Sequence, residues 1–94
     1  MPLFAIHALD KPGLGHVRAE NRPAHVAHLD SVSEHVLVAG PLLASDGVSM
    51  IGSLLIIDFP DEAAARAWAS ADPYAQAGLF ETAIVRQYRK VRPL

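Results

Sequence analysis

Short apolar segments alternate with segments of helical period along this chain, and their order limits the possible folds more than any other feature. Apolar segments bounded by Gly, Pro and Asp are typical of strands, and they cover residues 2–9, 36–43, 50–59 and 81–91. Helical period covers residues 21–35 and 61–71. The order βαββαβ predicts an α+β, ferredoxin-like fold, in which a four-stranded antiparallel sheet carries two helices on one face.

Local signals set the expected ends of the two helices. Asn21 is a favoured capping residue and Pro23 is tolerated in a first turn, so together they predict where the first helix begins. Pro73 restricts the residue before it and predicts that the second helix ends at Asp72. The segment 74–80 is expected to be a short helical turn or a loop.

Length and apolar content predict how the chain assembles. Its 94 residues fit one domain, covering 1–94. Hydrophobic residues make up 51% of the sequence, which is more than so small a domain can hide between one sheet and two helices. The second face of the sheet also needs a cover, and another copy of the chain is the simplest one. We therefore expect a homodimer whose sheets pack face to face.

Charge and composition exclude several classes of protein. The 8 basic and 10 acidic side chains are interspersed and give a net charge of −2, so no nucleic-acid partner is expected. No segment approaches the roughly 20 apolar residues that cross a bilayer, so no membrane association is expected either. The N-terminus lacks the basic flank and long apolar run of a signal peptide. The chain has no cysteine. We expect a cytoplasmic protein.

One histidine is aimed at the sheet by the first helix. At about 100° per residue, Leu29 lies about 40° from His25 and Val32 lies about −20° from it, so His25 is in the middle of the apolar stripe. A histidine there is either a core residue whose ring nitrogens are both hydrogen-bonded or a group that exchanges protons in a partly buried pocket. Periodicity does not separate these alternatives.

Asp72 stands at the end of the second predicted helix, where the helix dipole disfavours a carboxylate. One explanation is a turn-forming aspartate that bonds its own backbone, which is common beside proline. The other is that both helices pack on the same sheet face and bring Asp72 to His25. The carboxylate would then accept a hydrogen bond from one ring nitrogen and leave the other free as base or acid.

Three further residues are candidates for binding a substrate. Arg22 could clamp an anion or simply decorate the helix start, Tyr74 could donate its hydroxyl or simply pack, and Ser45 could touch a ligand from a turn that ordinary turn chemistry also explains. His25 and His28 have a chelating i, i+3 spacing, but they lie about 60° apart and no acid shares their face. No metal is expected. No glycine pattern indicates a phosphate loop, so no cofactor is expected.

Three motifs in order, "RPAHVAHL", "AGPLL" and "ADPYAQAGLF", resemble those of the YCII-related domain (YciI-like) family, over nearly the whole chain. The resemblance implies a ferredoxin-like dimeric α+β barrel and a catalytic His–Asp pair, here His25 and Asp72. A related dehydrochlorinase implies that the scaffold supports proton-transfer elimination on small ring compounds. The connection "ASDGVSMIG" is shorter than in the commonest pattern, so the resemblance leaves substrate choice open.

Three functions compete at this point. The first is a cofactor-free lyase or isomerase in which His25 is the general acid or base, Asp72 orients it, and a small polar or aromatic substrate is bound between sheet and helices. The second is a non-catalytic ligand-binding or regulatory dimer that uses the same pocket. The third is a structural dimer whose His–Asp pair only supports the fold. A pocket that reaches a free nitrogen of His25 would favour the first two.

Overall fold

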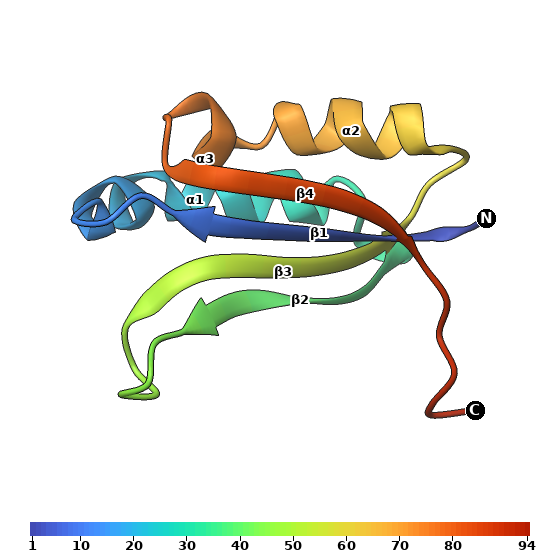
Figure 1. Ribbon diagram of the computed structural model, residues 1–94. Helices are drawn as coiled ribbons and strands as arrows, with labels where there is room; N and C mark the ends of the chain where they lie inside the picture. The colour runs from blue at the N-terminus through green and yellow to red at the C-terminus, as the bar shows by residue number, and fades with distance from the viewer.

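The computed structural model describes residues 1–94 and has the element order expected from the sequence (Figure 1). The elements are β1 (Leu3–Asp10), α1 (Gly15–Asp30), the short 3-10 helix η1 (Ser33–His35), β2 (Val36–Leu43), β3 (Met50–Asp58), α2 (Glu62–Ser70), α3 (Pro73–Gln76) and β4 (Phe80–Tyr88). No helix has the length and apolar character needed to cross a membrane.

The strands form a single antiparallel sheet in the order β2-β3-β1-β4. β1 is therefore central and pairs with both β3 and β4. The helices lie together on one side of this sheet (Figure 1). The predicted ferredoxin-like α+β fold is confirmed.

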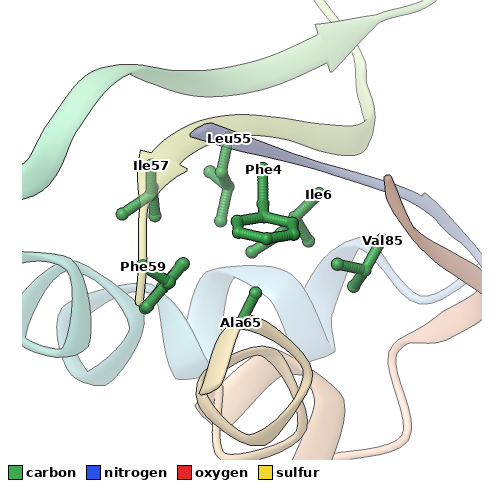
Figure 2. Close-up of a cluster of buried hydrophobic side chains, with 7 residues drawn as sticks. All are labelled: Phe4, Ile6, Leu55, Ile57, Phe59, Ala65 and Val85. Atoms are coloured by element: carbon green, nitrogen blue, oxygen red, sulfur yellow. The ribbon is translucent and has the colours of Figure 1, made fainter. Parts of the chain in front are cut away.

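Alternation along the central strand decides which side chains enter the core. Phe4, Ile6 and Ala8 point to the helices and are buried, while the residues between them face the other side of the sheet. Leu55 and Ile57 of β3 join them on the helical side. Figure 2 shows the resulting cluster between sheet and helices, which consists of Phe4, Ile6, Leu55, Ile57, Phe59, Ala65 and Val85.

The prediction for the first helix was wrong at both ends. α1 begins two turns earlier, at Gly15, and ends at Asp30, after which η1 continues to His35. Asn21 does not cap the helix; its side-chain amide donates to the carbonyl of Val17 within it. Pro23 lies inside the helix rather than in its first turn, at a typical cost of about 3 kcal/mol. Tertiary packing of α1 therefore overrides two local start signals.

The face of the sheet away from the helices is mostly apolar, although His7 and Arg86 also lie on it, and no helix of the chain covers it. His7 is paired with Leu54 on one side and Ile84 on the other, and all three side chains lie on this face. Val38 and Tyr88 also lie there and are 52% and 39% exposed. We call His7, Leu54, Ile84, Val38 and Tyr88 the open sheet face.

A close approach of two backbones makes one glycine indispensable. A Cβ at Gly52 of β3 would collide with the carbonyl oxygen of Ala8, whereas a Cβ at Gly40 of β2 would meet nothing within 4 Å. We expect Gly52→Ala to lower the free energy of unfolding by about 1–3 kcal/mol, the usual cost of overpacking, and Gly40→Ala to change it by less than about 0.5 kcal/mol. Urea denaturation of both variants at equal protein concentration measures the difference. Equal midpoints would contradict it.

Candidate active site

His25 and Asp72 lie within hydrogen-bond distance in the interior of the protein. Nδ1 of His25 is 2.9 Å from Oδ1 and 3.0 Å from Oδ2 of the carboxylate. His25 comes from α1 and is 7% exposed, and Asp72 comes from the junction of α2 and α3 and is 3% exposed. A carboxylate only accepts hydrogen bonds, so Nδ1 carries the proton and the tautomer of the ring is fixed.

Asp72 also has a local reason to be where it is. It is the N-cap of α3, and its Oδ1 accepts a hydrogen bond of 2.9 Å from the backbone N–H of Tyr74. The end of α2 is thus immediately followed by the start of another helix, where a carboxylate is favourable. The two explanations offered by the sequence are not exclusive, because the same carboxylate caps α3 and accepts from His25.

The second ring nitrogen of His25 has no protein partner. The hydrogen bonds of the ring all involve Nδ1, and Nε2 is not among the buried polar atoms cut off from solvent. His25 lines a pocket of about 200 Å³ between α1 and the sheet. With the proton on Nδ1, Nε2 carries a lone pair and can accept a proton from a bound molecule.

The aromatic ring of Tyr74 packs against the imidazole of His25. Its ring stacks on His25 with 4.0 Å between centroids and 17° between planes, and Phe80 meets it edge-on. Burial raises the pKa of Tyr74 more than the cations of Arg18 and Arg22 lower it. The hydroxyl therefore stays protonated at neutral pH. It lines the pocket beside the guanidinium of Arg18.

A buried arginine that the sequence reasoning missed completes this cluster. Arg18 donates from Nε and Nη2 to the two oxygens of Asp10, at 2.7 and 2.8 Å, and from Nη2 to Ser53 Oγ at 3.1 Å. Its guanidinium lies 4.6 Å from the centre of the Tyr74 ring. Burial works against its charge, but the interactions with Asp10 and Tyr74 together outweigh burial, and the pKa of Arg18 is raised.

Arg18 lay outside the predicted helix, which is why it was missed. Extending the helical wheel back by two turns puts Arg18 about 20° from His25. Arg22 falls about 60° from His25 by the same count. The pocket is indeed lined by this face of α1 and by facing strands, and its lining residues are Arg18, Arg22, His25, Val26, Leu29, Ala39, Gly40, Pro41, Met50, Ser53 and Tyr74.

The other predicted site residues divide into two groups. Arg22 and Tyr74 line the pocket with His25, and Arg22 is exposed and forms no ion pair. Ser45 is not brought to the pocket. It lies in the exposed turn between β2 and β3, where the carboxylate of Asp46 accepts hydrogen bonds from Val48 and Ser49.

The remaining histidine of the motif has a structural partner. Nε2 of His28 lies 2.9 Å from the carbonyl oxygen of Trp68, and the two rings stack with 4.1 Å between centroids. This contact joins α1 to α2. No three His, Asp or Glu side chains come together in a group that could hold a metal ion.

The chain is similar in sequence and fold to several known proteins. Protein YciI of Escherichia coli O6:H1 is 38% identical over 96 residues, which cover 95% of this chain and 98% of that protein. The structure of 5-chloro-2-hydroxyhydroquinone dehydrochlorinase (TftG) from Burkholderia phenoliruptrix AC1100, in complex with 2,5-dihydroxybenzoquinone, is 32% identical, with a TM-score of 0.87 and 96% coverage of both chains. An antibiotic biosynthesis monooxygenase structure shares the fold alone, at 13% identity and a TM-score of 0.56.

The family model of the YCII-related domain matches residues 2–89, which is nearly the whole chain. Curated relatives with the name YciI match over the same extent. The chain therefore belongs to the family of the YCII-related domain.

Proposed function

We propose that this protein is a cofactor-free enzyme that transfers a proton on a small ring compound, as a lyase or an isomerase. His25 is the general base and acid, and Asp72 orients its ring and stabilises the imidazolium that forms. The single observation that carries the proposal is the free Nε2 of a buried, oriented histidine at a pocket. A histidine that only supported the fold would have both nitrogens bonded within the protein.

The step begins with a substrate whose acidic C–H or O–H bond lies against Nε2. The bond breaks, the proton goes to Nε2, and its electron pair stays on the substrate. In an elimination this pair becomes a double bond while a leaving group departs from the neighbouring carbon with its own bonding pair. The imidazolium then returns the proton to the leaving group or to water. In an isomerisation the proton returns to a different atom of the substrate.

The similarity to TftG supports this class of reaction. TftG is a dehydrochlorinase, and its structure holds 2,5-dihydroxybenzoquinone, a small oxygenated ring. At 32% identity over 96% of both chains, the two proteins share a scaffold on which an elimination is known. A non-catalytic ligand-binding dimer that uses the same pocket is the alternative, and only turnover separates it from an enzyme.

Conservative substitutions in the pair are expected to remove activity without unfolding the protein. Asn keeps the shape and the capping ability of residue 72, and Gln keeps a polar side chain at residue 25. Asp72→Asn and His25→Gln should therefore each change the free energy of unfolding by at most about 1–2 kcal/mol. Turnover of a true substrate should fall at least about a hundredfold in each variant, because general acid–base catalysis is lost. Screening hydroxylated and halogenated single-ring compounds by absorbance measures this.

The double variant provides the internal control for that experiment. Since His25 and Asp72 act as one unit, combining both substitutions should cost little more activity than either alone. Losses that multiply would mean that the residues act separately. A substrate that binds to the wild type and is never turned over would instead favour the ligand-binding alternative.

We also propose that the protein is a homodimer that buries the open sheet face of each copy. An apolar surface at the centre of a sheet, in so small a domain, is typical of an interaction site. Two copies related by a twofold axis would cover it with an identical apolar surface. The helical side, which carries the pocket, would stay free.

Sedimentation at micromolar concentration tests this assembly. We expect twice the chain mass of 10.1 kDa for the wild type. Ile84→Glu should give a monomer, because it would bury an unpaired charge in the interface. Ala63→Glu on the exposed side of α2 is the matched control and should stay dimeric. A wild-type monomer would contradict the proposal.

A further inference from the structure

A single hydrogen bond connects α1 to α2. Nε2 of His28 on α1 lies 2.9 Å from the carbonyl oxygen of Trp68 on α2, and no other hydrogen bond of the structure runs between these two helices. A carbonyl oxygen only accepts, so Nε2 of His28 carries a proton and is the donor. This donor is present whether or not Nδ1 of the same ring is protonated.

The accepting carbonyl lies in the last turn of α2, which leads directly to Asp72. α2 ends at Ser70, and Asp72 is the second residue after it. Carbonyls in the last turn of a helix lack a full set of helical partners, and a histidine side chain can supply a donor. The Trp68 carbonyl accepts from the backbone N–H of Ala71 at 3.2 Å and from the imidazole of His28. His28 therefore holds the turn that precedes the carboxylate of the site.

The two contacts between these segments lie about one helical turn apart. His28 is three residues after His25, and Trp68 is four residues before Asp72. Both spacings are close to the roughly 3.6 residues of one turn, which is about 5.4 Å along a helix. One hydrogen bond lets two segments pivot about it, whereas two bonds one turn apart also fix the angle between them. The bond of His28 therefore restrains the pair of His25 and Asp72.

Trp68 gives His28 a well-held surface to pack on. Its indole stacks on the imidazole with 4.1 Å between centroids and 17° between planes. The indole also contacts Phe59 of the core cluster, at 5.9 Å between centroids. Nε1 of Trp68 is sealed from solvent and has no acceptor, so packing rather than hydrogen bonding holds the indole. An imidazole that stacks on this ring and donates to the carbonyl of the same residue has little freedom to move.

His28 can influence the site only through the position of other residues. Neither His28 nor Trp68 lines the pocket, so neither contacts a bound molecule. The distances from Nδ1 of His25 to the Asp72 oxygens are 2.9 and 3.0 Å, and a hydrogen bond weakens beyond about 3.2 Å. A displacement of about 1 Å at a catalytic group can cost about a hundredfold in rate. A small shift of the last turn of α2 would therefore be felt at His25.

We propose that His28 is a positioning residue of the candidate active site, which places the Asp72 carboxylate against Nδ1 of His25 by holding the last turn of α2. The part of the inference that concerns catalysis rests on the proposed function. With Asp72 in place, the proton stays on Nδ1 of His25, and Nε2 is left as the base. With the last turn of α2 released, the carboxylate moves and this tautomer is no longer fixed.

Two variants of nearly equal size isolate the donor of His28. Gln can donate to the Trp68 carbonyl and Leu cannot, while both are good helix formers. The measurement is the exchange with water of the His25 Nδ1 proton, followed by NMR in protein labelled with ¹⁵N, and it needs no substrate. We expect His28→Leu to speed this exchange at least about tenfold, the size expected from leaving a partly buried acceptor unpaired. His28→Gln should stay within about threefold of the wild type.

Two controls separate positioning from a general loss of stability. His16→Leu changes an exposed histidine of α1 that forms no hydrogen bond and should leave the exchange unchanged. Ile6→Val trims the core away from the contact of His28 and should speed the backbone amides of β1 and the His25 proton alike. In His28→Leu the His25 proton should be accelerated more than the amides of β1.

Turnover adds a second measurement once a substrate is found. His28→Leu should lower kcat at least about tenfold and change KM by less than about threefold, because His28 does not contact the pocket. His28→Gln should keep most of the activity. This split between kcat and KM would not follow from loss of fold alone.

The outcomes distinguish this inference from the proposed reaction. The positioning role is overturned by a His25 proton that exchanges equally in His28→Leu and the wild type, by equal exchange in the Leu and Gln variants, or by β1 amides that accelerate in parallel. The absence of a protected Nδ1 proton in the wild type would refute it as well. The expected exchange in a protein that turns over no compound would refute the proton transfer and leave the positioning role intact.

Discussion

The carboxylate of Asp72 is the contact on which the site depends. It accepts from the ring of His25 on α1 and from the backbone of Tyr74 at the start of α3, both at 2.9 Å. A charge that is 3% exposed is costly unless several donors satisfy it, and these donors come from two separate elements. Satisfying the charge therefore brings together the imidazole and the phenol ring that stacks on it. Direct stacking of the two rings and the contact of Phe80 with Tyr74 add to this arrangement.

At each end of the pocket, an aspartate holds a side chain of α1 in place. Arg18 and His25 lie on one face of α1, and each is held from behind by an aspartate, Asp10 from the central strand and Asp72 from the α2–α3 junction. In each case the aspartate accepts hydrogen bonds from some of the nitrogens of the α1 side chain, and another nitrogen of that side chain does not bond to the aspartate. The helix thus carries an oriented cation at one end and an oriented base at the other, with Arg22 between them on the same face.

The sequence predicted the fold and the face of His25 well, because βαββαβ order and helical period depend on residues close together in the chain. Arg18 was missed because Asn21 and Pro23 are strong local start signals, and only packing of α1 on the sheet shows that they are overridden. The sequence did not show that Asp72 caps a helix. The helix that it caps, α3, is only four residues long, which is too short for periodicity to reveal. Pairs such as Arg18 with Asp10 join separate elements, and no local pattern encodes them.

The shortness of α3 has a consequence for how the site opens. An isolated helix of fewer than about 12 residues is marginal in water, so α3 persists through its cap and through bonds such as Leu79 N–H to the Tyr74 carbonyl. If this segment unfolds locally, Asp72 and Tyr74 move away together. His25 then loses its hydrogen-bond acceptor and the ring that stacks on it in one event. Amide hydrogen exchange in α3 thus reports how often the site is dismantled, and the free energy of that local opening sets the fraction of molecules ready to react.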